Sequence, residues 1–213
     1  KLFEKIPDED WRKTTWIAPE DAGKAPGKKY RTILTDEEFK KIPEYTGIKF
    51  RCKNGEQRDF NVGAAADYPL MRIEEMYLIA AEAECRLGND AGAREYLMDL
   101  MSKRDASYSC AQKSGTSMGK LTSDYTGSLL EEIIIQRRIE LWGEFGRIYD
   151  IRRLKQGFKR TAEMGWPTDA LLVNRNANDP ESYMWVLTIP QTEFDGNSSL
   201  DQTKDQNPVG DTK

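Results

Sequence analysis

The strongest local constraint on the fold is the helical spacing of apolar residues between positions 70 and 104. The first apolar set recurs at steps of three and four residues and comprises Ile73, Met76, Tyr77, Ala80, Ala83 and Leu87. This spacing predicts an amphipathic helix that buries these residues. Gly88 can end that helix and Asn89 can cap a second one. The second helix is expected to bury Ala93, Leu97, Leu100 and Met101, which makes residues 70–104 a helical hairpin.

The spacing within this hairpin resembles that of a tetratricopeptide repeat. Tyr77 occupies the aromatic position, Gly88 the turn between the helices, and Ala81 and Ala93 the two small positions. Small residues let two helices approach closely, while an aromatic ring fills the groove of a neighbour. One such repeat cannot bury its core alone, so its packing partners are expected elsewhere in the fold.

The fold class is therefore predicted to be mainly α, with tetratricopeptide-like helical hairpins, long irregular loops and minor β structure. We interpret residues 1–213 as a single domain with three parts: an irregular loop region at 1–67, a helical core at 68–156 and an irregular region at 157–213. The core should contain a third helix that begins at Ser128, with Glu131 completing a capping box. Its apolar stripe would include Leu130, Ile134 and Leu141, with Ile133 beside it.

Several shorter elements are also expected. Thr35 and Glu38 predict a capped helix over 35–41, and residues 147–156 should form another short helix. Alternating or apolar runs predict strand-like pieces at 47–52 and 183–189. Residues 105–127 are rich in Ser, Gly and Thr and should form a loop, and the polar tail after Gly196 is expected to be extended.

Composition excludes several functional classes. The chain has 213 residues, a net charge of −4 and no dominant basic cluster, so nucleic acid is not an expected partner. No apolar run reaches the roughly 20 residues that a membrane-spanning helix requires. The chain contains no histidine, which removes imidazole bases and imidazole metal ligands. Cys52, Cys85 and Cys110 show neither a zinc pattern nor a disulfide framework, although one bridge between two of them is allowed.

Four charged residues, Arg137, Glu140, Glu144 and Arg147, lie three or four positions apart and would share a helix face if the helix continued past Gly143. One interpretation is a carboxylate pair for glycoside hydrolysis. The favoured interpretation is a structural ion network, because flanking arginines hold carboxylates ionised and so remove the general acid. No catalytic residue, metal ligand or cofactor is therefore predicted. The acidic residues Asp36, Glu37 and Glu38 are expected to serve a helix N-terminus rather than a calcium site.

Aromatic residues in the irregular N-terminal region are candidates for glycan binding: Trp11, Trp16, Tyr30 and Tyr45. A pyranose ring can stack its C–H face on indole or phenol while nearby polar groups bind its hydroxyls. The alternative is that these rings only cover the helical core. Three further tryptophans, Trp142, Trp166 and Trp185, lie in apolar patterns and are expected to pack internally.

Three stretches in order resemble the C-terminal half of the SusD/RagB family. The first is PLMRIEEMYLIAAEA at 69–83, and the second is QRRIELWGEFGRIYDIRR at 136–153. The third comprises IPQTE at 189–193, Asn197 and QNP at 206–208. Gln136 stands where the family usually has Glu, and Phe145 precedes Gly146 where the family has glycine first.

The resemblance implies a non-catalytic protein that binds an extracellular nutrient, most simply an oligosaccharide, and passes it to a SusC-like TonB-dependent transporter. It also implies an outer-membrane, surface-exposed lipoprotein whose anchor and further helical repeats lie outside this chain. A peptide cargo, a tetratricopeptide-like protein–protein adaptor and a carboxylate-dependent glycosidase remain the alternatives.

Overall fold

The computed structural model describes residues 2–30, 34–50, 69–144, 146–159, 179–180, 182 and 185–208. The chain divides into two compact units. Unit 1 comprises Lys1–Thr116 and Gly127–Phe145, and unit 2 comprises Ser117–Thr126 and Gly146–Lys213. The interpretation of residues 1–213 as one domain stays a prediction, and each unit is described here by itself.

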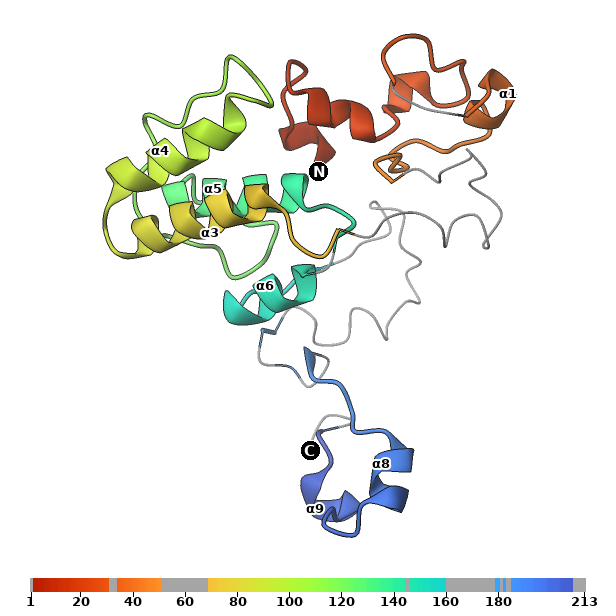
Figure 1. Cartoon of the computed structure of the whole chain (residues 1–213), viewed down its shortest axis with the longest axis vertical. Helices are drawn as coiled ribbons and strands as arrows, with labels where there is room; N and C mark the ends of the chain where they lie inside the picture. Colours follow the sequence, from red (N-terminus) through yellow and green to blue (C-terminus); the bar gives the residue numbers. More distant parts are fainter. Residues whose placement is uncertain are drawn as a thin grey trace. The chain divides into compact units, whose positions relative to one another are not determined.

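Three helices form the centre of unit 1: α3 (Ile73–Arg86), α4 (Asp90–Met101) and α5 (Leu129–Glu140). Helix α3 packs against both α4 and α5 (Figure 1). The side chain of Asn89 accepts a hydrogen bond from the Gly92 amide, and that of Ser128 accepts one from the Glu131 amide. These caps satisfy amides that have no partner inside the helix. The predicted hairpin and the mainly helical fold class are confirmed.

The N-terminal part of unit 1 consists of short helical turns: η1 (Phe3–Lys5), η2 (Trp11–Thr15), η3 (Pro19–Asp21) and α1 (Asp36–Phe39). The predicted capping box of Thr35 and Glu38 is present at the start of α1. The described residues contain no sheet, only isolated bridges between Trp16 and Gly47 and between Leu121 and Gly157. Residues 51 and 52 of the predicted run at 47–52 lie outside the described residues.

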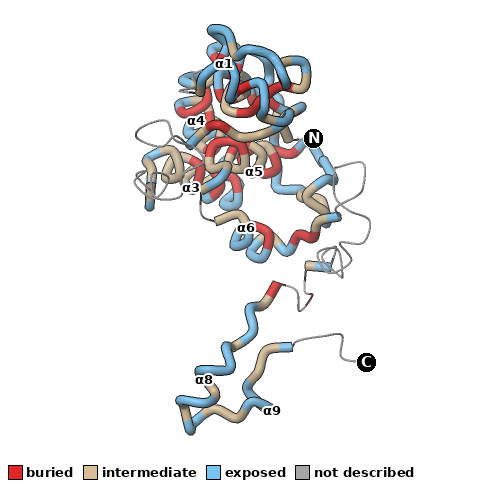
Figure 2. The backbone as a smooth tube through the Cα atoms, turned by 90° about the vertical axis from the view of Figure 1, so that its right-hand side faces the viewer, coloured by how far each residue is buried: buried red, intermediate tan, exposed pale blue. Residues whose placement is uncertain are grey.

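The predicted buried face of α3 is wrong. Helix α3 buries Leu78, Ala81, Glu82 and Cys85, whereas Ile73 and Leu87 of the predicted stripe are 67% and 82% exposed. The reason is that α3 is apolar on two opposite faces, and the face with Ala81 packs against α4 and α5. Figure 2 shows the alternation of buried and exposed positions along these helices.

The third helix ends before Glu144 and Arg147, so the four charged residues of the predicted ion network do not lie on one continuous helix. Helix α5 stops at Glu140, and Gly143 and Gly146 adopt φ angles of 74° and 135°. Such angles are strained for residues with a Cβ atom and turn the chain out of the helix. Leu141, expected on the buried stripe, is consequently the half-buried cap of α5.

Two apolar clusters hold the N-terminal segment of unit 1 together. One contains Ile17, Tyr30, Phe39 and Ile48. The other joins Ile6 and Trp16 to Ile139 of α5, with Trp142 packed against it. The Trp16 and Trp142 rings meet edge to face with their centroids 5.1 Å apart, an arrangement that aromatic pairs favour.

Unit 2 contains α6 (Arg147–Arg153), α8 (Gln191–Gly196) and α9 (Gln202–Asp205). The expectation of an extended tail after Gly196 is wrong, because Asp201 caps α9 by accepting the Thr203 amide. The side chain of Gln206 bonds both the amide and the carbonyl of Ile189, which closes the segment between them. Residues 183 and 184 of the predicted strand at 183–189, and Trp166, lie outside the described residues.

Among the helices of the described residues, none combines the length and apolar character needed to cross a membrane.

We expect Gly47→Ala to destabilise unit 1, because a Cβ atom at Gly47 would lie 1.8 Å from Cη2 of Trp142. Overpacking of this kind costs roughly 1–3 kcal/mol. Thermal and urea unfolding followed by circular dichroism and tryptophan fluorescence would measure the loss. Gly196→Ala is the matched control, because no atom lies within 4 Å of its added Cβ. Equal stability of the two variants would contradict the packing described here.

Candidate functional site

The short helix η2 sends neighbouring side chains in opposite directions. Asp10 caps η2 by accepting the Arg12 amide at 2.9 Å. Arg12 points into the protein and is only 3% exposed, whereas Trp11 is 51% exposed. Because η2 is a tight turn, adjacent side chains cannot share a face. The segment therefore contributes one buried cation and one surface ring.

Arg12 connects the N-terminal segment to α5. Its Nη1 donates to Oε2 of Glu140 at 3.0 Å, and its Nη2 donates to Oε1 of Gln136 at 2.6 Å. The same guanidinium donates to both carboxylate oxygens of Asp10. A buried cation is tolerated only when its donors are satisfied in this way.

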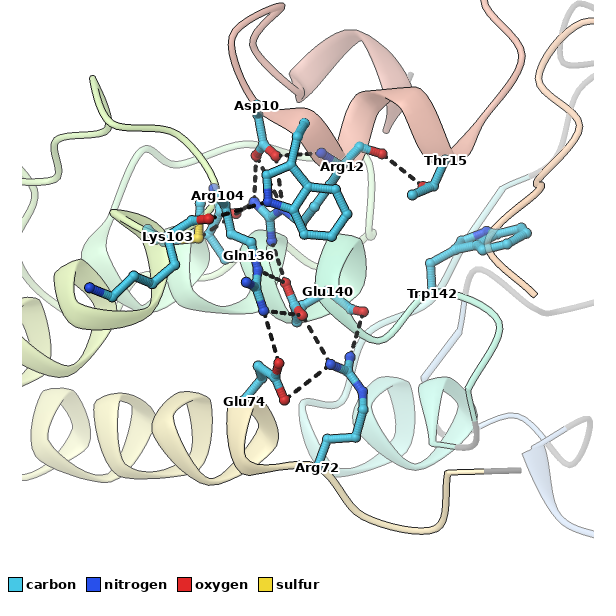
Figure 3. Close-up of polar contacts among 12 residues, drawn as sticks. Asp10, Arg12, Thr15, Arg72, Glu74, Lys103, Arg104, Gln136, Glu140 and Trp142 are labelled. Atoms are coloured by element: carbon cyan, nitrogen blue, oxygen red, sulfur yellow. Dashed lines mark hydrogen bonds and ion pairs between the residues drawn. The ribbon is translucent and has the colours of Figure 1, made fainter. Parts of the chain in front are cut away.

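Glu140 is the centre of this polar cluster and is 5% exposed (Figure 3). Besides Arg12, it accepts hydrogen bonds from Arg104 at 3.0 and 3.1 Å and from Arg72 at 3.1 Å. Glu74 bridges the same two guanidinium groups from the first turn of α3, at 2.9 Å from Arg104 and 3.1 Å from Arg72. Three arginines from three separate segments therefore converge on one buried carboxylate.

The pKa of Glu140 reflects two opposing effects. Burial favours the neutral carboxyl, but the guanidinium groups of Arg104, Arg12 and Arg72 outweigh burial and lower the pKa to about 2. Glu140 is therefore ionised throughout the physiological range.

A second carboxylate, Glu144, extends the cluster beyond the end of α5. Arg72 donates to both of its carboxylate oxygens at 2.9 Å, and Lys49 also contacts it. The Lys49 ammonium additionally donates to the carbonyl oxygens of Glu140 and Trp142. Burial disfavours the charged form of Glu144, yet the hydrogen bonds from Arg72 and Lys49 leave its pKa below the usual value.

We call this cluster the Glu140 network. It comprises four cations, Arg12, Lys49, Arg72 and Arg104, and four carboxylates, Asp10, Glu74, Glu140 and Glu144. Because the pKa values of both Glu140 and Glu144 are lowered, neither provides the protonated carboxyl that a glycosidase needs as general acid. The arrangement suits a rigid support for a binding surface.

A cleft of about 880 Å³ lies directly beside the Glu140 network, within unit 1. Trp11 lines it together with Thr14, Thr15, Ile48 and Ile139. The Trp11 indole N–H donates to the Lys103 carbonyl at 3.2 Å, and the Arg104 guanidinium lies 5.4 Å from the ring centroid. The ring is therefore held in place while half of the side chain stays exposed.

The predicted aromatic candidates do not form one surface. Trp16 and Tyr30 are 6% and 5% exposed and belong to the two different apolar clusters. Tyr45 is 45% exposed, adopts a φ of 58° and meets Phe3 edge to face at 5.5 Å. Of the four candidates, only Trp11 lines the cleft. The assignment of all four to glycan binding stays a prediction.

The residues of the predicted ion network do not all share the same partners. Glu140 and Glu144 share Arg72, whereas Arg137 donates to Glu75 at 2.6 Å. Arg147 is the first residue of α6 in unit 2. The part of the chain that the structure describes contains no group of three His, Cys, Asp or Glu residues arranged to hold a metal ion.

The model of the SusD family matches residues 10–208, which is most of the chain. The chain belongs to the SusD family. It is also similar to the crystal structure of a "putative sugar binding protein" from Bacteroides vulgatus ATCC 8482, with 25% sequence identity and a TM-score of 0.57. The similarity covers 98% of this chain and 37% of that one. No curated protein matches.

For this SusD-family chain, sequence reasoning missed most of the Glu140 network, namely Asp10, Arg12, Lys49, Arg72, Glu74 and Arg104. It also missed Gln136, which accepts a hydrogen bond from Arg12. One signal was present, because Arg72 is the arginine of the first family-like stretch at 69–83. Arg12 and Arg104 carry no comparable signal, since their partners lie 128 and 36 positions away.

We expect Glu140→Gln to lower the free energy of unfolding at pH 7 by on the order of 3 kcal/mol, because it leaves buried guanidinium groups uncompensated. Folding lowers the pKa of Glu140 to about 2. Its stabilisation is therefore complete above the unfolded pKa of about 4.3 and is lost as the pH falls toward 2. Urea unfolding of both proteins between pH 7 and pH 2 should show the difference shrinking below about pH 4.3.

The control is Glu37→Gln, which removes an exposed pair with Lys40 and should leave the free energy of unfolding nearly unchanged, because solvent screens exposed ion pairs. A stability difference between wild type and Glu140→Gln that is the same at every pH would contradict the assigned ionisation.

Proposed function

We propose that this chain takes part in binding an extracellular oligosaccharide at the outer-membrane surface, for import through a SusC-like TonB-dependent transporter. Membership of the SusD family supports this proposal, because members of the family are binding proteins and are generally not enzymes. The similarity to a structure described as a "putative sugar binding protein" supports it as well. In the proposal the whole protein is a surface-exposed lipoprotein of the outer membrane.

The observation that carries the proposal is the position of Trp11 beside the cleft. A sugar ring needs a fixed apolar face for its C–H groups and polar groups for its hydroxyls. Trp11 supplies the ring, held by Lys103 and Arg104. Thr14 and Thr15 also line the cleft. Their hydroxyls already donate to the Trp11 and Arg12 carbonyls, so toward a ligand they can act as acceptors. Rigid aromatic rings bind with a small loss of conformational entropy, which favours affinity for a flexible ligand.

Binding and delivery require no covalent chemistry. The protein would hold the oligosaccharide at the mouth of the transporter and release it for uptake. The lowered pKa values of Glu140 and Glu144 agree with this proposal better than with a glycosidase, which needs one neutral carboxyl.

A protein–protein adaptor is the second candidate, and one observation favours it. The outward face of α3 carries exposed apolar side chains, including Ile73, Ile79 and Leu87. Exposed apolar patches often mark contacts with other proteins. Such a contact is compatible with glycan binding, because this face of α3 contributes nothing to the lining of the cleft.

We expect Trp11→Ala to weaken glycan binding strongly, measured as reduced retardation of the chain in affinity gels that contain a panel of plant and host polysaccharides. Losing one stacking ring should weaken binding by roughly 1–3 kcal/mol, as judged from the transfer of an aromatic side chain. Trp11→Phe, which keeps a ring but loses the hydrogen bond to Lys103, should retain part of the retardation.

The control is Tyr96→Ala, which removes another exposed ring of unit 1 that does not line the cleft. Circular dichroism would verify that each variant is folded. If no polysaccharide retards the wild-type chain, or if Trp11→Ala binds as the wild type does, the proposed role of this cleft is wrong.

A further inference from the structure

The lining of the cleft is strongly cationic, although the whole chain has a net charge of −4. Six cationic side chains reach the lining: Arg12, Lys28, Lys29, Lys49, Arg72 and Arg104. Among the residues that the structure describes, only two carboxylates, Glu74 and Glu140, reach it. Concentration of one sign of charge in a concave site raises the local concentration of ligands with the opposite charge.

Several carboxylates that pair with these cations do not line the cleft. Asp10 and Glu144 belong to the Glu140 network but do not line the cleft. Lys29 pairs with Asp21 at 2.6 Å and Glu20 at 3.3 Å, and neither of these carboxylates lines the cleft. A ligand in the cleft is therefore closer to the cations than to several of their counter-charges. Because Coulomb energies fall with distance, the nearer charges dominate.

Lys28 adds a cation that the described part of the chain does not pair. It is exposed at the lining of the cleft, and no described carboxylate lies within ion-pair distance of its ammonium. Lys49 and Arg72, by contrast, already hold Glu144. A new anion can thus bind Lys28 without displacing an existing ion pair.

Resting on the proposed function, we infer that the oligosaccharide is acidic, with a carboxylate or sulfate ester attracted to the cationic lining and paired with Lys28. Trp11 stacks a sugar ring, and the cationic side chains distinguish a charged sugar from its neutral counterpart. Carboxylated and sulfated oligosaccharides share the relevant chemistry, because both carry an anionic group on a pyranose ring.

The test measures the affinity of the full chain for matched pairs of polymers. Polygalacturonate is compared with carboxyl-reduced polygalacturonate, which tests recognition of a carboxylate. Dextran sulfate is compared with dextran, which tests recognition of a sulfate ester. Lys28→Gln should weaken binding of the acidic partner about two- to fivefold, as expected for one exposed ion pair. Lys28→Glu should weaken it further. Affinity for the acidic polymer should also fall as sodium chloride rises from 0.05 to about 0.5 M, because salt screens exposed charges.

Lys41→Glu is the matched control, because Lys41 is exposed in the same unit and does not line the cleft. It should leave binding unchanged. Polyglutamate serves as an anionic polymer without sugar rings and should bind more weakly than either acidic polysaccharide. Binding of the acidic polysaccharides should also require Trp11.

Preference for one acidic polymer over its neutral counterpart, reduced by Lys28→Glu and not by Lys41→Glu, would establish the inference. Equal binding of neutral and acidic partners, still lost in Trp11→Ala, would overturn it while leaving the proposed glycan binding intact. Binding of polyglutamate as strong as that of the acidic polysaccharides would overturn it in favour of an acidic peptide cargo. Failure of every polysaccharide would remove both proposals.

Discussion

The way in which the segments of unit 1 meet depends on the pairing of one buried carboxylate, that of Glu140. Glu140 lies at the C-terminal end of α5 with 5% of its surface exposed, and it is stable there only because Arg12, Arg72 and Arg104 surround it. These arginines come from η2, from the residue before α3 and from the segment after α4. Removing any one partner leaves buried charge uncompensated, which costs several kcal/mol. The network therefore fixes how three segments far apart in sequence meet around one helix end.

The helices could be predicted from sequence because their signals are local. Steps of three and four residues, Gly88 and the caps at Asn89 and Ser128 lie within a few positions of the structure that they determine. The buried face of α3 could not be predicted in the same way. Both the stripe with Leu87 and the stripe with Leu78 satisfy helical periodicity, and only the packing of α4 and α5 chooses between them. Local pattern determined that a helix forms, and tertiary contacts determined which side is buried.

The candidate site was less predictable for a related physical reason. Its ion pairs connect residues that are 36 to 128 positions apart, and no periodicity links such partners. Two polar residues, Gln136 and Glu140, are buried within the last turns of α5. A buried polar group must find a partner, so the sequence indicated that partners exist without naming them. Trp11 was predicted as a glycan-binding candidate and lies half exposed at the cleft, but its neighbour Arg12 was not recognised as the residue that anchors η2.

In the proposed binding mode, recognition is divided between two parts of the cleft: a floor formed by the Glu140 network and a rim formed by Trp11 and Lys28. Opening the bonds between Glu140 and its arginines to admit a ligand would cost several kcal/mol, more than the roughly 1 kcal/mol that one new hydrogen bond returns. The floor should therefore keep its internal pairing and act on a ligand through its electric field. Selection then falls to groups that can change partners cheaply, which are the exposed face of Trp11 and the ammonium of Lys28. If the cleft binds an oligosaccharide as proposed, this division lets stability and binding coexist, because substitutions at the rim leave the buried charges of the floor paired.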